Sequence, residues 1–326
     1  MNKIISQFSV SPFGLLVSVG LLIWLIISLK MTKKLKKRNK SHVTLAGTLS
    51  CFAFSVPVGL IFARLFWCIS NYYDYLLSPA SIYKIWEGGL SLWGFILGFW
   101  ITTIILAKKY DISGALTLDA FSLGLTLFIA ILRASEVFTG QGVGRIITYD
   151  FLVNPLITVY DVHGEARFAV YRLEAFYALI LFLIMLSRVK KHAHAGKHAH
   201  GDLWRIALAG YAMAQIVFES MRDDDYMRFG FVRVSQAISI LILLIFAFYY
   251  VYRLKKTHLL RMHFLWMIPL ALSACAFVIY EEFRVDAALN TEKEHLFMLV
   301  GAFFLFLPSL FATNKLLKRK KRSNLS

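Results

Sequence analysis

Cysteine, proline and acidic residues are all scarce in this sequence. Its 326 residues include three cysteines, six prolines and 19 Asp and Glu, against 36 Lys and Arg. Cys51, Cys68 and Cys275 all lie in predicted apolar helices, which argues against a disulfide framework and a thiolate metal site. A removable signal peptide is not indicated either. No small-residue cleavage motif is evident, and the basic cluster MTKKLKKRNK follows the first apolar run, so we expect a retained anchor.

Long apolar stretches, by contrast, fill the chain. Hydrophobic residues make up 58% of it and the mean hydropathy is +0.63, values that exclude an ordinary soluble domain. Because backbone groups cannot stay unpaired in lipid, apolar stretches of roughly 20 residues must be helices. The sequence therefore predicts an all-α polytopic integral membrane protein with about nine transmembrane helices. They are expected at residues 12–30, 45–70, 89–107, 114–133, 169–187, 203–221, 231–252, 263–281 and 296–314.

The net charge of +17 would suit nucleic acid, but its distribution favours a membrane. Most Lys and Arg residues lie in alternate connections, namely 30–40, 108–109, 188–205, 253–261 and 315–322. The intervening connections hold most of the acids. This is the positive-inside pattern, with the N-terminus outside and the C-terminus in the cytoplasm. We expect the basic loops to contact anionic lipid and no nucleic acid to be bound.

One low-complexity stretch, KHAHAGKHAH, lies in a predicted cytoplasmic loop. It contains His192, His194, His198 and His200. Clustered imidazoles bind transition metals, but this stretch is rich in small residues and has no fixed geometry. We favour a solvated linker that titrates near neutrality, with a metal site as the alternative. No cofactor or metal is expected elsewhere.

Arg133 is the most informative single residue, because it lies where an apolar helix gives way to the turn RASEVFTGQGVGR. An arginine at membrane depth normally faces the bundle interior, a partner or an aqueous cavity. Gly140, Gly142 and Gly144 follow at alternate positions and allow close backbone approach. A guanidinium beside exposed amides suits a phosphate. The structural alternative is that Arg133 caps its own helix or pairs with Glu136.

A polar stripe in a later helix points to the same region. In GYAMAQIVFESMR the residues Tyr211, Gln215, Glu219 and Arg222 fall on one helix face, which should turn toward the bundle interior. Hydrogen bonding between helices is the alternative role for them. The remaining polar features also map to the outer side. They are Arg64 near the outer end of the second helix, and the long segment 134–168, which either covers a cavity or is a simple loop.

Read together, these segments resemble the prolipoprotein diacylglyceryl transferase family. The quoted blocks are SPFGLLVSVGLL, ARLF, IWEGGLSLWGFILG, RASEVFTGQGVGR, AVYRLEA, GYAMAQIVFESMR and QAIS. They occur in the family's order across about residues 8–255. Glu174 of AVYRLEA falls in register with a family glutamate. We therefore divide the chain into a family-like membrane domain, residues 1–255, and an additional transmembrane hairpin with a basic tail, residues 256–326.

The resemblance implies a specific activity in the bacterial cytoplasmic (inner) membrane. Family members move the diacylglyceryl group of phosphatidylglycerol to the lipobox cysteine thiol of prolipoproteins and release glycerol phosphate. By resemblance, Arg133, Tyr211 and Glu219 are the candidate catalytic residues. Candidate substrate-binding residues are Arg133, Glu136, Gly144, Arg64, Gln215 and Arg222.

Several family positions are replaced here. Trp93 stands where the family has a histidine, Gln215 where it has an arginine, and Phe13 where it has a tyrosine. Glu136 and Gln141 replace the asparagine and glutamate of the signature. A general base contributes ~10²–10⁴-fold to a rate, but a thiol ionises in part without one. We therefore expect a divergent transferase. The alternative is a catalytically silent paralogue that binds anionic phospholipid or a lipoprotein precursor. A transporter is disfavoured, because no inverted repeat is visible.

Overall fold

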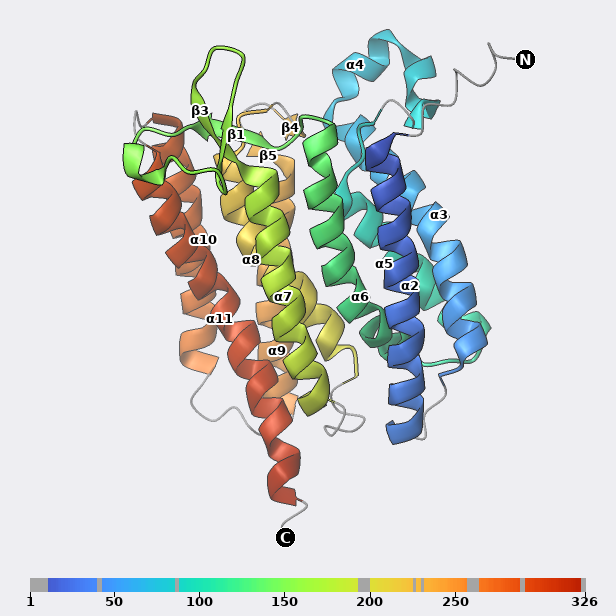
Figure 1. Ribbon diagram of the computed structural model, residues 1–326. Coiled ribbons are helices and arrows are strands. Elements are labelled where there is room, and N and C mark those ends of the chain that lie inside the picture. Colours follow the sequence, from blue (N-terminus) through green and yellow to red (C-terminus); the bar gives the residue numbers. More distant parts are fainter. Residues whose placement is uncertain are drawn as a thin grey trace, which may run out of the picture.

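The fold is a bundle of long, roughly parallel helices (Figure 1). The computed structural model describes residues 11–39, 43–85, 88–192, 200–224, 227–229, 232–256, 264–287 and 291–323. Within these ranges the long helices are α2 (Pro12–Asn39), α3 (Leu45–Ser70), α5 (Leu92–Lys109), α6 (Gly114–Ser135), α7 (Val170–His192), α8 (Asp202–Met221), α9 (Val234–Lys256), α10 (Phe264–Ala287) and α11 (Glu292–Ser323).

Every predicted apolar stretch forms one of these helices, so the all-α membrane fold is confirmed. In the described part of the chain, eight helices are long and apolar enough to cross a membrane. The ninth long helix, α8, does not reach that apolarity, because Arg205, Gln215 and Glu219 interrupt its sequence. Several helices continue past the predicted ends. For example, α2 extends through its basic segment to Asn39, since Lys and Arg are good helix formers.

Short elements gather at one end of the bundle, opposite to the end at which α11 finishes (Figure 1). They include α4 (Tyr72–Leu77) and the 3₁₀ helices η1 (Pro79–Tyr83), η3 (Glu136–Phe138) and η4 (Asp150–Leu152). Strands β1 (Val143–Ile146), β2 (Thr158–Tyr160) and β3 (Ala166–Ala169) form an antiparallel sheet in the order β1-β3-β2. A second, two-stranded sheet pairs β4 (Arg228–Phe229) with β5 (Val232–Arg233). Segment 134–168 is therefore folded.

Glycines let α5 approach α3 closely. A Cβ at Gly94 would lie 2.6 Å from the carbonyl oxygen of Phe62, and one at Gly98 would lie 2.7 Å from the Phe62 side chain. Small residues four apart are the usual basis of close helix packing in membranes. The N-terminus of α5 is fixed by Ser91, whose Oγ accepts a hydrogen bond from the Gly94 amide at 3.2 Å. This packing sets the position of Trp93.

An aromatic cluster fills the adjacent core. The Trp24 ring of α2 stacks on Phe99 of α5 and Phe128 of α6, with centroids 4.8 and 5.3 Å apart. The Trp24 indole N–H donates to the Phe121 carbonyl at 2.9 Å, so its polar atom is satisfied inside the core. The three cysteines are free thiols.

The C-terminal helices join the bundle rather than standing apart from it. α11 packs against both α8 and α9, and α10 packs against α9 and α11. In Figure 1 the red α11 runs along the whole length of the bundle. Of the four clustered histidines, His194 and His198 lie outside the described residues. Within those residues, no group of His, Cys, Asp and Glu has an arrangement that could hold a metal ion.

Candidate functional site

Arg133 lies buried at the C-terminal end of α6, surrounded by two carboxylates and a phenol. Its Nη1 is 2.5 Å from Glu136 Oε1, and its Nε is 2.5 Å from Glu174 Oε2. Its Nη2 donates to the Tyr211 hydroxyl oxygen at 3.0 Å. The structure thus brings together Arg133, Glu136 and Tyr211 of the predicted site. It also shows that Arg133 pairs with Glu136, as the structural alternative expected.

The turn after α6 places Glu136 over Arg133. Helix α6 ends at Ser135 and continues as η3 from Glu136. Gly142 then has φ +73°, in the left-handed region, and a Cβ there would lie 3.1 Å from Glu136 Oε2. Glycine is therefore required by both conformation and space. The chain then continues as β1, where Gly144 pairs with Arg222 at the end of α8.

From the sequence, Glu174 was noted only because it aligns with a glutamate of the family. In the structure it lies at the centre of the cluster around Arg133. It comes from the start of α7 and is fully buried. One carboxylate oxygen contacts Arg133 and the other lies 3.9 Å from Arg222 Nη1. Two guanidinium groups from α6 and the end of α8 thus share one carboxylate. A buried acid near the start of an apolar helix was the available signal.

The predicted polar face of α8 is confirmed as an inward-facing stripe. Tyr211, Gln215, Glu219 and Arg222 are all buried. Gln215 Nε2 donates to Glu219 Oε2 at 3.0 Å, so these two residues bond along their own helix. Glu219 also lies within electrostatic range of Arg222, Arg233 and Arg133.

Arg222 is tied to the segment that follows α8. Its Nη2 and Nε donate to Asp224 at 2.7 and 3.0 Å. Burial alone raises the pKa of the Asp224 carboxyl, but hydrogen bonding to Arg222 and its charge outweigh burial, so this pKa lies below its ordinary value. Gly144 forms an isolated antiparallel bridge with Arg222. A Cβ at Gly144 would lie 2.8 Å from the Met221 carbonyl, so this glycine serves chain packing.

Several acceptor atoms in the cluster have no hydrogen-bond donor among the described residues. They are Glu136 Oε2, both oxygens of Glu174, Gln215 Oε1 and Glu219 Oε1. The close Arg133–Glu174 contact is ionic, since its geometry is not that of a hydrogen bond. Buried acceptors without donors are rare and costly in folded proteins. The cluster is therefore suited to a ligand that brings hydroxyl or thiol donors.

Arg64 is held in a different environment from Arg133. Its guanidinium donates to the backbone carbonyls of Ser81, Ile82, Gly88 and Gly89. It also lies over the Tyr75 ring, 5.3 Å from the centroid. Through these contacts Arg64 holds the connection between α3 and α5 in place. Its role in substrate binding stays a prediction. Phe13 lies near the start of α2, half-buried.

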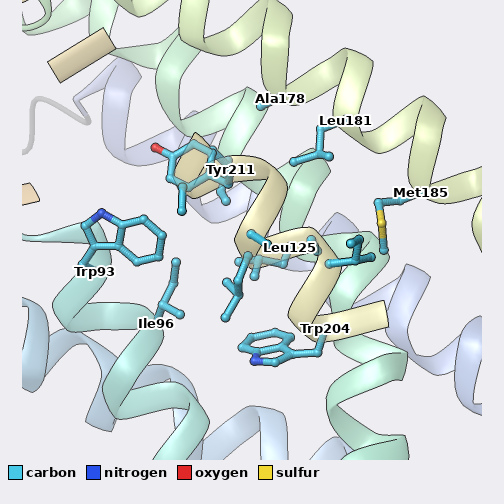
Figure 2. Close-up of a cluster of buried hydrophobic side chains, with 14 of the residues drawn as sticks. Trp93, Ile96, Leu125, Ala178, Leu181, Met185, Trp204 and Tyr211 are labelled. Atoms are coloured by element: carbon cyan, nitrogen blue, oxygen red, sulfur yellow. The ribbon is translucent and has the colours of Figure 1, made fainter. Parts of the chain in front are cut away.

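Trp93 connects the polar cluster to an apolar groove. Its ring centroid is 5.6 Å from that of Tyr211. Figure 2 shows these two rings side by side, with Ile96 and Trp204 beyond them. Trp93 also lines a groove of about 590 Å³ between α5 and α9, which continues past Trp100 to Arg205 and Tyr249. An apolar groove along a membrane helix has the shape and chemistry to hold an acyl chain.

Two further charged residues were not singled out from the sequence. The first is Asp224, the ion-pair partner of Arg222. Arg233 of β5 was not mentioned, although its side chain is only 1% exposed and its Nη2 donates to the Arg222 carbonyl at 2.8 Å. Asp224 lies just after the predicted helix 203–221, and Arg233 lies at the start of the predicted helix 231–252. At such positions a sequence gives no direct sign that a side chain is buried.

Comparisons with known proteins give a consistent result. The family model described as prolipoprotein diacylglyceryl transferase matches residues 2–252. The chain is 25% identical over 258 residues to a protein of Lactobacillus delbrueckii subsp. bulgaricus, covering 77% of this chain and 90% of the relative. It is 29% identical over 195 residues to one of Lactiplantibacillus plantarum, covering 58% and 68%. Both relatives are named phosphatidylglycerol–prolipoprotein diacylglyceryl transferase. A relative in Halalkalibacterium halodurans with the same name is 24% identical, covering 73% of this chain and 81% of its own.

Proposed function

The chain belongs to the prolipoprotein diacylglyceryl transferase family, and from that premise we propose that it moves the diacylglyceryl group of phosphatidylglycerol onto a lipobox cysteine thiol. It is a multi-pass membrane protein. We place it in the bacterial cytoplasmic membrane with the Arg133 end facing outward, on the basis of its positively charged loops. The substrates would be phosphatidylglycerol and prolipoprotein signal peptides, with no nucleic acid and no cofactor.

The observation that carries this proposal is the contact between Trp93 and Tyr211, because it joins an anion-binding cluster to an acyl-chain groove. A phospholipid needs both features, in that order along its length. Its acyl chains would lie in the groove along α5 and α9. Its phosphate would then reach Arg133 on the polar side of Tyr211.

In the proposed complex, Arg133 and Arg222 hold the phosphate. Each guanidinium now contacts Glu174, so the phosphate would take over part of this pairing and that of Glu136. Charge-assisted bonds from a guanidinium fork are among the strongest in proteins. The glycerol hydroxyls of the head group would donate to acceptors that have no donor among the described residues, such as Gln215 Oε1.

The transfer step needs no group beyond these residues and the two substrates. The cysteine sulfur attacks the glyceryl carbon that carries the phosphate ester. The C–S bond forms as the C–O bond breaks, and the electron pair of that bond stays on the departing glycerol phosphate. We assign proton acceptance from the thiol to Glu219, whose Oε1 has no donor among the described residues. Tyr211 orients Arg133 through the hydroxyl contact at 3.0 Å. Fixed donors at developing charge contribute ~10²–10³-fold.

The test is transfer by purified protein in membranes that contain phosphatidylglycerol, with a lipobox peptide as acceptor and the thioether product detected by mass spectrometry. We expect transfer by the natural chain, a fall of ~10²-fold or more with Arg133→Ala, and a smaller fall with Tyr211→Phe. Transfer that is indifferent to Arg133→Ala would remove the proposed site. Phosphatidylglycerol binding without any product would instead favour a silent lipid-binding paralogue.

A further inference from the structure

The last two helices lie beyond the family match, which ends at residue 252 inside α9. α10 and α11 nevertheless meet the elements that carry the proposed site. α11 packs along α8, which bears the Tyr211 to Arg222 stripe, and both helices pack against α9. Polar contacts between the hairpin and the rest of the chain concentrate at the outer end of the bundle.

Glu282 of α10 makes the most direct of these connections. Its Oε1 lies 3.7 Å from Nε of Arg233, a residue of the family-matched region. Among the described residues, Glu282 is the one carboxylate within ion-pair distance of Arg233. Arg233 in turn donates to the main-chain carbonyl of Arg222 at 2.8 Å. An acid from the hairpin thus stabilises the buried arginine that holds the backbone of a proposed phosphate ligand. Removing one partner of a buried ion pair leaves the charge of the other without compensation, and this strongly destabilises the folded state.

The same carboxylate also binds Gln236, in the first turn of α9. Glu282 Oε2 accepts a hydrogen bond from Gln236 Nε2 at 2.8 Å. The Gln236 amide also donates to the Ile216 carbonyl of α8 at 3.1 Å, next to Gln215. The side chain of Gln236 therefore bridges α10 and α8. Both links from Glu282 end on the backbone of α8 or the residue that follows it.

The hairpin also holds the strand after Gly144. Arg145 of β1 pairs with Asp286 of α10 at 2.8 Å. Glu292 at the start of α11 accepts from the Thr148 amide at 2.7 Å. The β1 segment pairs through Gly144 with Arg222, so the hairpin contacts both this strand and the residues around the end of α8. A hairpin that served only as an extra anchor would not require these polar contacts.

We propose that the α10–α11 hairpin is part of the transferase site in this chain, and that Glu282 is a positioning residue that fixes Arg222 through Arg233. The inference rests on the proposed function for the role of Arg222. Gln215 replaces the arginine expected from the family pattern, which leaves Arg133 and Arg222 as the guanidiniums in contact with Glu174. A chain with fewer phosphate ligands depends more on how accurately each is placed.

The experiment compares the natural full-length chain with Glu282→Ala, Glu282→Asp and a matched control, Arg284→Gln. Arg284 pairs with Glu294 at 3.0 Å within the hairpin, so its loss disturbs α10–α11 without touching Arg233 or Gln236. Four quantities are measured: the melting temperature in detergent, kcat and KM for transfer, and the Kd for phosphatidylglycerol in phosphatidylcholine nanodiscs.

We expect Glu282→Ala to weaken phosphatidylglycerol binding and to lower kcat/KM by roughly 10- to 100-fold, mainly through KM, the range that a misplaced group produces. Glu282→Asp should recover part of the loss, and Arg284→Gln should stay within about twofold of the natural chain. Equal Kd values for the natural chain and Glu282→Ala would overturn the inference, as would equal losses in Glu282→Ala and Arg284→Gln. If the natural chain binds lipid but transfers nothing, the proposed function fails and the Kd ratio alone decides the role of Glu282. A natural chain that does not bind phosphatidylglycerol would overturn both.

Discussion

At the scale of single residues, the site is a balance of buried charges. Arg133 and Arg222 face Glu136, Glu174 and Asp224 across short distances. Such buried ion pairs contribute little net stability, because the desolvation of the charges offsets their attraction. Their retention at one end of an apolar bundle is therefore better explained by binding than by folding. Glu174 contacts both arginines and therefore sets the distance between them.

Two of the replaced family positions, Trp93 and Gln215, can be changed back to the family residues. Trp93 lies against Tyr211, and Gln215 bonds to Glu219 one turn away. The double change Trp93→His with Gln215→Arg would return a proton acceptor beside Tyr211 and a third guanidinium on the α8 stripe. We predict a faster single-turnover transfer, about 10-fold or more, since a general base contributes ~10²–10⁴-fold. Trp93→Phe with Gln215 unchanged is the control and should give no gain. A folded double variant with an unchanged rate would contradict this assignment.

The Asp224–Arg222 pair gives a pH dependence of stability. The folded-state pKa of Asp224 lies below its ordinary value, which is about 3.9 in unfolded chains. Its contribution is therefore fully present above that value and is lost as the pH falls through the lower, folded pKa. We predict that Asp224→Asn lowers stability by about 1 kcal/mol at pH 7, a modest figure because the side chain is 31% exposed.

Thermal unfolding of the two proteins between pH 7 and pH 3 provides the measurement. The natural chain and Asp224→Asn should converge as the pH falls. Asp223→Asn is the control, because that carboxylate pairs with Arg167 and is 52% exposed. A constant difference between natural chain and Asp224→Asn at all pH values would exclude the titration of Asp224 as its cause.

At the scale of secondary-structure elements, the position of Trp93 depends on the contact between α3 and α5. Gly94 permits this contact, since its missing Cβ leaves room for the Phe62 carbonyl at 2.6 Å. Backbone cannot move aside as a flexible side chain does. The groove and the polar cluster share Trp93, so a shift of α5 would alter both.

We predict that Gly94→Ala destabilises the bundle by about 1–3 kcal/mol, the usual cost of overpacking, and lowers transfer activity. Gly14→Ala in α2 is the matched control, because a Cβ there meets nothing within 4 Å. In a helix this change should be neutral or slightly stabilising. Denaturation in detergent measures both. Equal effects of the two substitutions would show that the close α3–α5 contact is not what Gly94 provides.

A comparison of the elements with the sequence shows which parts of the fold could be predicted. Hydropathy locates helices well, because lipid demands both apolar length and internal hydrogen bonding. The sheet in segment 134–168 was missed, since strands of three or four residues give no period to read. The α8 stripe was found because 3.6-residue spacing exposes it. The central position of Glu174 and the burial of Arg233 were not predicted. Each residue pairs with a residue of another element, Arg133 for Glu174 and Glu282 for Arg233, and no local sequence pattern reveals such a pairing. The division at residue 255 stays a prediction.

At the scale of the whole molecule, polarity is unequal between the two ends of the bundle. The sheets, α4 and the Arg133 cluster occupy one end, and the basic segments that end α2 and α11 lie toward the other (Figure 1). In the proposed orientation, a lipid of the outer leaflet would present its phosphate at the end of the bundle that holds Arg133. The orientation is thus tied to the proposed chemistry.

The topology prediction follows from the same asymmetry. A reporter fused after Ser326 should behave as cytoplasmic, and one inserted within residues 145–160 as external. Paired reporters that are active only inside or only outside the cytoplasm, such as a fluorescent protein and alkaline phosphatase, give the measurement. An external C-terminal reporter would contradict the orientation and place the Arg133 cluster on the wrong side for phosphatidylglycerol of the outer leaflet.

The central claim is that Arg133 holds the phosphate of a phospholipid whose acyl chain lies beside Trp93. An experimental structure of the protein in nanodiscs rich in phosphatidylglycerol tests it most directly. The account predicts phosphate density within hydrogen-bonding distance, about 3 Å, of the Arg133 guanidinium, and acyl density in the groove along α5 and α9. A head group bound instead at Arg64, with Arg133 still paired only to Glu136, Glu174 and Tyr211, would contradict it.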